Sequence, residues 1–132
     1  MARPTKRELN QLRASFIAGL VSYMNYGGAT DEADPDFDPD FDPGYIQADI
    51  NRCAKIVDEL LASLESVAEK KSESILKAVK TAVIKLNKLN DQCDGGLLET
   101  DQREQLCAII LAAAKRAGLA SDHDITEEWR EW

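Results

Sequence analysis

The sequence predicts an all-α fold: a four-helix antiparallel bundle with an extended acidic strap between the first two helices and a short C-terminal helix. Apolar residues recur at three- and four-residue steps along most of the chain, which is the period of an amphipathic helix. The alternation typical of half-buried strands is nearly absent. With 132 residues the chain has the size of one domain. We therefore expect a single helical domain over residues 1–132, in which residues 26–44 form the strap.

The first helix is predicted to begin after Thr5, because Thr5 and Glu8 have the spacing of a capping box. Gly27 and Gly28 are expected to end it, since glycine readily adopts the left-handed conformation that follows many helices. The residues expected to face the core are Leu9, Leu12, Phe16, Leu20 and Tyr23.

A heptad seam marks the second helix, which is expected to begin near Pro43 because proline suits the first helical turn. Leu60 lies in the middle of the seam and is expected to be a central core residue. A break is predicted at Lys70, Lys71 and Ser72, with one continuous helix through this point as the alternative. The seam alternates steps of four and three residues, and its members are Ile46, Ile50, Cys53, Val57, Leu60, Leu64 and Val67.

Two further helices are predicted after this break. The third begins near Ser72 and ends at residues 94–96, where two glycines interrupt the periodicity. The fourth runs from an N-cap at Thr100 to Gly118. Their expected core residues are Ile75, Val79, Ala82, Leu86 and Leu89 in the third helix and Leu106, Ile109, Ile110 and Ala113 in the fourth.

A short last helix is predicted to begin at Asp124, with Glu127 completing a second capping box. It carries Trp129 and Trp132, which lie three residues apart and would share one helix face. Two interpretations stay open: the pair packs against the bundle, or it protrudes as an aromatic anchor for a partner. Both tryptophans are therefore candidate partner-binding residues.

The strap carries a four-residue repeat, DPDF-DPDF-DPGY, over residues 34–45. Prolines lack a backbone donor and push the preceding residue toward extended conformations, so this segment cannot continue a helix or sit inside a sheet. Side chains of an extended chain alternate between two faces, which predicts a carboxylate edge and an apolar edge. The candidate partner-binding residues are Asp34, Asp36, Asp38, Asp40 and Asp42 on the first edge and Phe37 and Phe41 on the second.

Three interpretations of the strap stay open. Phe37 and Phe41 could pack on the protein's own bundle and leave the aspartates in solvent. The carboxylates could instead meet lysine and arginine side chains in a basic cleft of a partner. The five aspartates could also bind Ca²⁺, which takes six to eight oxygen ligands. Because the prolines resist the turn that would wrap an ion, we expect the strap to be metal-free.

No pattern of catalytic residues is present. Cys53, Cys93 and Cys107 are an odd number without a CxxC pair, which argues against disulfides and a zinc site. His123 is the only histidine. Residues 90–101 contain the glycine of an EF-hand loop but lack its terminal glutamate, so they are interpreted as a plain connection. P-loop, GxGxxG and HExxH motifs are absent. We expect neither an enzyme nor a cofactor or metal site.

The charge is negative overall and unevenly distributed. The net charge is −8, and residues 30–44 hold seven acids and no base, whereas residues 70–88 hold six lysines and one glutamate. This balance disfavours nucleic acid and anionic membranes and favours a basic protein partner. No run approaches the roughly 20 apolar residues of a membrane span, and no apolar stretch follows the basic N-terminal residues. A cytoplasmic protein is expected.

The leading hypothesis is a small acidic protein-binding module, an inhibitor that occupies a basic cleft on a toxin or nuclease. Bacterial immunity proteins are similar in kind, being short, acidic and without catalytic motifs. No motif of theirs is matched, so no residue role is transferred. One alternative is a self-assembly module that forms a homodimer through the seam of the second helix and the tryptophan pair. The other is a calcium-binding protein that uses the strap.

Overall fold

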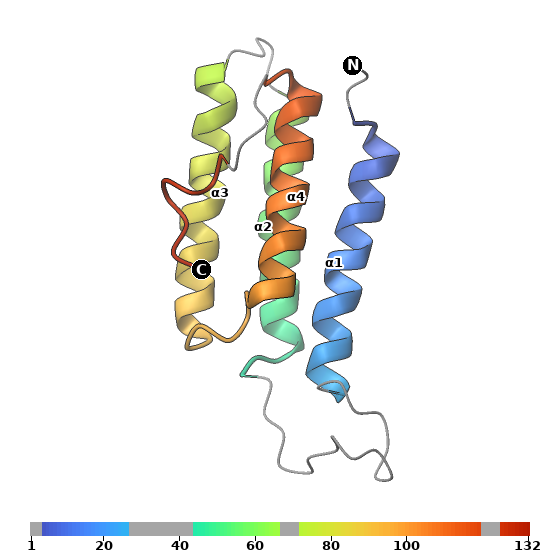
Figure 1. Cartoon of the computed structure of the whole chain (residues 1–132), viewed down its shortest axis with the longest axis vertical. Coiled ribbons are helices and arrows are strands. Elements are labelled where there is room, and N and C mark those ends of the chain that lie inside the picture. Colours follow the sequence, from blue (N-terminus) through green and yellow to red (C-terminus); the bar gives the residue numbers. More distant parts are fainter. Residues whose placement is uncertain (1–3, 27–43, 67–71, 120–124) are drawn as a thin grey trace.

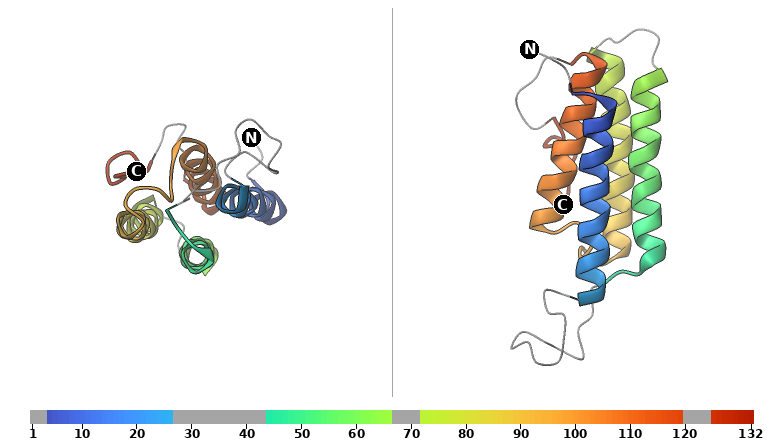
Figure 2. Two further views of the ribbon diagram at one scale, coloured as in Figure 1. Left: turned by 90° about the horizontal axis from the view of Figure 1, so that it is seen from below. Right: turned by 90° about the vertical axis from the view of Figure 1, so that its right-hand side faces the viewer.

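The computed structural model describes residues 4–26, 44–66, 72–119 and 125–132, and within them the chain is all-helical with four helices and no strand. The prediction of an all-α fold is confirmed. The helices are α1 (Lys6–Tyr26), α2 (Gln47–Ser66), α3 (Ser72–Gln92) and α4 (Thr100–Ala117). They lie side by side in Figures 1 and 2.

The two central helices are α2 and α4, which contact each other and also contact both α1 and α3. The view along the helix axes in Figure 2 shows the same arrangement, with α1 and α3 at opposite edges. All four helices contribute to one hydrophobic core. Its largest fully buried side chains include Phe16 and Leu20 of α1, Ile50 of α2, Leu86 of α3 and Ile109 of α4.

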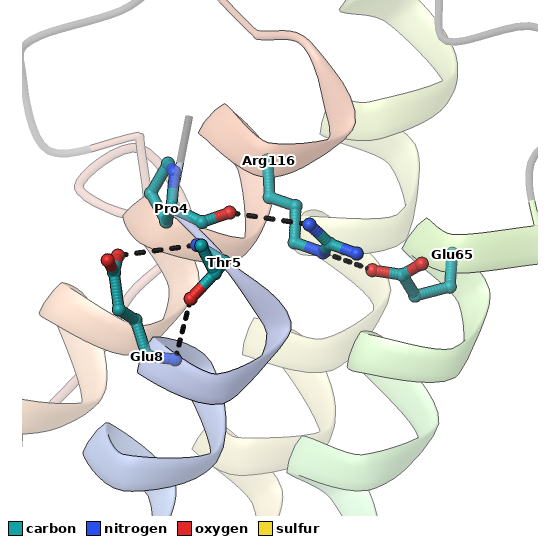
Figure 3. A network of polar contacts seen from close by, with 5 residues as sticks. All are labelled: Pro4, Thr5, Glu8, Glu65 and Arg116. Atoms are coloured by element: carbon teal, nitrogen blue, oxygen red, sulfur yellow. Dashed lines mark hydrogen bonds and ion pairs between the residues drawn. The ribbon is translucent and has the colours of Figure 1, made fainter. Parts of the chain in front are cut away.

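The capping box predicted for α1 is formed. The Glu8 backbone N–H donates to Thr5 Oγ1 at 3.1 Å, and the Thr5 N–H donates to Glu8 Oε2 at 3.3 Å (Figure 3). Next to it, Arg116 near the end of α4 donates to Glu65 Oε1 near the end of α2 at 2.5 Å and to the Pro4 carbonyl at 3.5 Å. The start of α1 and the ends of α2 and α4 therefore meet at one end of the molecule.

The heptad seam of α2 faces the core. Leu60 is 4% exposed, which confirms its predicted place in the core. Ile46 lies one residue before the helix and is 64% exposed, so the first seam position is not buried. Val67 lies outside the described residues. The seam residues that the core buries are Ile50, Cys53, Val57, Leu60 and Leu64.

The predicted boundaries of α2 and α3 need small corrections. The second helix begins at Gln47 rather than near Pro43, because the Asp49 carboxylate accepts the Ile46 N–H at 3.0 Å and caps the helix there. α2 and α3 are separate helices that pack against each other, as the break at Lys70–Ser72 predicted. The predicted core residues of α3, from Ile75 to Leu89, are all buried.

The N-cap of α4 was predicted one residue too late. Glu99 takes this position, with extended backbone at φ −86° and ψ −174°, and Thr100 is the first helical residue. The Glu99 carbonyl already accepts the Arg103 N–H at 2.7 Å, and no side chain caps the helix. At the other end Gly118 adopts φ 115°, and its N–H and that of Leu119 return to the last helical turn, as predicted for a glycine stop.

The short C-terminal helix predicted from Asp124 is wrong for the described residues, since residues 125–129 form a turn and residues 130–132 have no regular secondary structure. The N–H groups of Trp129 and Arg130 both donate to the Thr126 carbonyl. Beyond this turn the Asn87 side chain of α3 donates to the Trp129 carbonyl at 2.7 Å and accepts the Glu131 N–H at 3.0 Å. Asn87 therefore binds the backbone groups that a helix would need to continue.

Candidate functional site

The predicted strap residues lie outside the described residues, and the structure describes only the two points where the strap joins the helices. One is the end of α1 at Tyr26, which shows that this residue belongs to the helix rather than to the strap. The other is Gly44 and Tyr45, just before α2. The strap residues outside the description are Asp34, Asp36, Phe37, Asp38, Asp40, Phe41 and Asp42.

Tyr45 anchors the strap to the core. Its side chain is 4% exposed, and its hydroxyl donates to the Leu20 carbonyl of α1 at 2.8 Å. Its ring stacks on Tyr23, with the centroids 6.4 Å apart and the planes 18° from parallel. Burial, reinforced by Tyr23 and Glu99, raises the pKa of Tyr45 to about 12, so the hydroxyl stays a donor at neutral pH. The start of α2 is thus fixed beside the end of α1.

Gly44 packs against the connection between α3 and α4. It adopts φ 83°, and a Cβ at this residue would lie 3.8 Å from the Cys93 carbonyl and 3.9 Å from the Gly96 Cα. The left-handed backbone explains a glycine here better than crowding does, because both contacts are ordinary van der Waals distances. The end of α1, the start of α2 and the α3–α4 connection therefore meet at one end of the molecule, at the bottom of Figure 1.

Asn90 shapes the α3–α4 connection. It is 6% exposed, and its Oδ1 accepts the N–H groups of Leu97 at 3.2 Å and Leu98 at 2.9 Å. Asp94 and Gly95 take positive φ values of 54° and 78°. The side-chain amide of Asn90 therefore holds this interhelical connection in place.

Four acidic residues are exposed around this connection, where α3 ends and α4 begins. Together with the strap's two attachment points they define what we call the acidic end of the molecule. Residues 94–132 hold nine acids and four bases, but the linear order of the chain could not show that these four residues lie beside the strap's attachments. The four residues are Asp91, Asp94, Glu99 and Asp101.

Two thiols near the acidic end are buried, and neither is suited to nucleophilic catalysis or metal binding. Burial, reinforced by Cys93, raises the pKa of Cys53 to about 12. Burial, reinforced by the Asp49 carboxylate, also raises the pKa of Cys93. Both cysteines are free and buried, and a protonated thiol is a poor nucleophile and a poor metal ligand.

The tryptophan pair lies on α3 and α4 rather than at the acidic end. Trp129 and Trp132 are half-buried and pack against the core. Asn87 holds the segment to α3, and the Arg130 guanidinium lies 5.4 Å from the Trp132 ring centroid. Much of each indole is therefore already in contact with the protein itself, and the partner-binding role of the pair stays a prediction.

His123 lies outside the described residues. Among the residues that the structure describes, no group of three or more histidine, cysteine, aspartate or glutamate side chains could hold a metal ion. None of the described helices combines the length and the apolar character needed to cross a membrane. Comparisons with protein-family models, with curated proteins and with solved structures found no match to this chain.

Proposed function

We propose that this chain is a small acidic protein-binding module of the cytoplasm, an antiparallel four-helix bundle whose acidic end occludes a basic cleft on another protein, such as a toxin or nuclease. One observation carries the proposal. The strap, with its seven acids between residues 30 and 44, is attached at the same end of the molecule that exposes Asp91, Asp94, Glu99 and Asp101. Carboxylates gathered at one end create a directed negative potential that scattered charges would not.

The attachments support a binding role. Tyr45 fixes the C-terminal side of the strap to α1 through the Leu20 carbonyl and the stacked Tyr23 ring. A segment tied at both ends loses less conformational entropy on binding than a free tail, because fewer chain conformations are open to it. Carboxylates on this segment would pair with arginine and lysine side chains of a partner and speed association by electrostatic steering.

The proposal is one of binding and not of catalysis. Cys53 and Cys93, the thiols nearest the acidic end, are buried with raised pKa values. No cofactor is part of the proposal. The alternative of a homodimer through the α2 seam loses support, because the seam residues from Ile50 to Leu64 are buried in the chain's own core.

The test begins with capture of partners on the immobilised full chain at low salt, followed by purification of the captured protein and measurement of its association rate. We expect a basic protein whose association slows about tenfold when the four exposed carboxylates are neutralised, because steering by charges of this kind dominates association rates at low salt. The variant carries Asp91→Asn, Asp94→Asn, Glu99→Gln and Asp101→Asn.

A matched variant neutralises four exposed carboxylates that lie elsewhere, and we expect its association rate to stay within about twofold of the wild type. If both variants slow association equally, only the net charge matters and the acidic end is not the interface. An acidic partner would also overturn the proposal. The control substitutions are Glu73→Gln, Glu127→Gln, Glu128→Gln and Glu131→Gln.

A further inference from the structure

A groove with the opposite charge runs between α2 and α3. It holds a cavity of about 650 Å³, and a smaller one of about 320 Å³ adjoins it toward the end of α3. The two cavities share Ile56, Glu59 and Lys85 in their walls, so they form one continuous depression, which we call the basic groove. Only residues of α2 and α3 line it within the described part of the chain.

The floor of the basic groove is apolar and made partly of small side chains. Ala78 and Ala82 of α3 face Ile56 and Leu60 of α2, and Leu89 continues the floor toward the end of α3. Alanine side chains are short and leave room above the backbone of α3 at Ala78 and Ala82. An apolar helix face could approach closely there, because small residues permit short interaxial distances.

The rim of the basic groove is positive. It carries five basic side chains and one acidic one, although the chain as a whole has a net charge of −8. Glu59, the acidic one, already pairs with Lys85 at 3.1 Å. Lys77, Lys85 and Lys88 of α3 line the same groove, whereas Lys80 does not. The basic residues are Arg52, Lys55, Lys77, Lys85 and Lys88.

Three of these lysines have no carboxylate within ion-pair distance among the described residues. All three are exposed. Arg52 differs from them, because it pairs with Asp49 at 2.9 Å. Unpaired positive charges along an apolar floor repel each other and are only partly offset by solvent. An acidic partner segment would relieve this repulsion and cover the floor at the same time. The three lysines are Lys55, Lys77 and Lys88.

Two other parts of the described surface differ from the basic groove. The C-terminal segment lies against α3 and α4, where Asn87 binds the backbone of Trp129 and Glu131 and the Cys107 sulfur lies 3.6 Å from Thr126 Oγ1. A cavity of about 510 Å³ between α1, α2 and α4 has walls of mixed charge, including the pair of Arg116 and Glu65. The basic groove differs from this cavity in combining an apolar floor with a rim mostly of one sign.

We propose that the basic groove binds an acidic amphipathic helix of a partner protein. A helix fits because its apolar residues recur at three- and four-residue steps and can follow the floor from Ala78 to Leu89, while glutamates on its flanks reach the lysines on either side. Nucleic acid fits less well, since the floor is apolar and the chain's net charge opposes a polyanion. This role is separate from the proposed function, because the face and the sign of charge both differ.

The experiment uses the full chain and a synthetic 18-residue helical peptide with leucines on one face and glutamates flanking them. Binding is followed by fluorescence anisotropy of the labelled peptide. Lys77→Glu combined with Lys88→Glu should weaken binding at least tenfold, since each reversal replaces an attraction with a repulsion. Lys80→Glu is the matched control: Lys80 is exposed on the same helix but does not line the groove, and this change should alter binding by less than about twofold.

A second measurement does not depend on the variants. Backbone NMR shifts of the wild-type chain, on addition of the peptide, should change at Ile56, Ala78 and Thr81 and stay unchanged at Glu99 and Asp101 of the acidic end. The proposal is overturned if the double variant and the control weaken binding equally, or if the shifts lie elsewhere. It is also overturned if a peptide with lysines in place of the glutamates binds as tightly, or if duplex DNA or anionic vesicles bind more tightly than the peptide.

The chain's own acidic residues are the remaining occupant to test. A synthetic peptide of residues 30–45 carries seven acids and two phenylalanines. If this peptide displaces the leucine–glutamate helix and binds more tightly, the groove serves the protein's own segment and the partner proposal fails. The acidic-end variant should bind the helical peptide like the wild type, so failure of the proposed function leaves this result unaffected.

Discussion

At the scale of single residues, two buried asparagines of α3 decide how the chain continues beyond this helix. Asn87 binds the backbone of the C-terminal segment, and Asn90 binds the backbone of the α3–α4 connection. They are 7% and 6% exposed and lie one helical turn apart. These roles could not be predicted from the sequence, because an asparagine in an amphipathic helix has the same pattern whether it faces solvent or a backbone.

Replacing Asn87 with alanine should release the C-terminal segment. The change leaves the Trp129 carbonyl and the Glu131 N–H without their partner, and each lost hydrogen bond costs about 0.5–1.5 kcal/mol. Tryptophan fluorescence should shift to the red as the half-buried indoles gain solvent, while the far-ultraviolet helix signal stays nearly constant. An unchanged emission maximum would mean that the tryptophans are held by packing alone.

Leu60→Ala should destabilise the core by about 2–5 kcal/mol, through lost transfer free energy and the cavity left behind. Leu60 is 4% exposed in the middle of the α2 seam. Urea unfolding followed by circular dichroism measures the loss. Leu61→Ala, at the half-buried neighbouring position, is the control and should cost less. A loss below about 1 kcal/mol for Leu60→Ala would contradict its place in the core.

Alkaline pH should destabilise the fold through Cys53 and Tyr45. Their pKa values are raised from 9.0 and 10.0 to about 12 in each case, so the folded chain keeps protons that the unfolded chain releases. The free energy of unfolding should thus be unaffected by these groups below about pH 8.5 and fall as the pH rises from about 9 toward 12. Urea titrations between pH 7 and 11 measure this slope. Tyr45→Phe should make the fall of the unfolding free energy with pH shallower above pH 10. An identical slope would mean that Tyr45 does not contribute to the loss of stability.

At the scale of elements, periodicity and caps predicted the four helices because both are local. The capping box of Thr5 and Glu8 and the glycine stop at Gly118 use atoms close in sequence. The short C-terminal helix was predicted from the same kind of pattern and is not formed, because Asn87, more than forty residues earlier, binds its backbone instead. The acidic end could not be predicted either, since it joins segments that are distant in the chain.

The two threonines at helix starts should differ in their contribution to stability. Thr5→Ala removes the hydroxyl that accepts the Glu8 N–H, and it should cost about 1 kcal/mol, the usual value of an N-cap. Thr100→Ala should cost less than about 0.5 kcal/mol, because Thr100 is inside α4 and Glu99 holds the cap position. Thermal unfolding of both variants provides the comparison. A larger loss for Thr100→Ala would restore it as the N-cap.

At the scale of the whole molecule, negative and positive side chains gather on different parts of the surface. The acidic end gathers the exposed carboxylates of the α3–α4 connection beside the attachments of the strap, while the groove between α2 and α3 has a rim of lysines. A net charge of −8 hides this separation. The molecule could therefore meet two partners of opposite charge on two faces, and salt should weaken both contacts.

The strap should bind no calcium, even though it holds five alternating aspartates. An extended segment interrupted by prolines cannot place six to eight oxygens around one ion. Isothermal titration calorimetry of the full chain with CaCl₂ should show no micromolar binding. Micromolar binding that Asp36→Asn and Asp38→Asn abolish would establish a calcium site and overturn this expectation.

Neutralising the strap should change partner association and leave the fold intact. A variant with Asp36→Asn, Asp38→Asn and Asp40→Asn loses three like charges that gain nothing from each other in solvent, so its melting temperature should stay nearly constant. Its association with the basic partner should slow and depend less on salt, because steering by exposed charges is screened beyond about 8–10 Å at physiological ionic strength.

Replacing the two phenylalanines of the strap distinguishes a role in packing from a role in partner binding. If Phe37 and Phe41 pack on the helices, their replacement by alanine lowers the melting temperature. If they insert into the partner, the same change raises the dissociation rate and spares the fold. We expect the first result, because two exposed phenylalanines beside prolines would promote aggregation of the free protein. The triple Asn variant then decides the interface itself. An unchanged association rate at low salt would show that the strap is not part of the interface. The acidic contact would then be formed by Asp91, Asp94, Glu99 and Asp101.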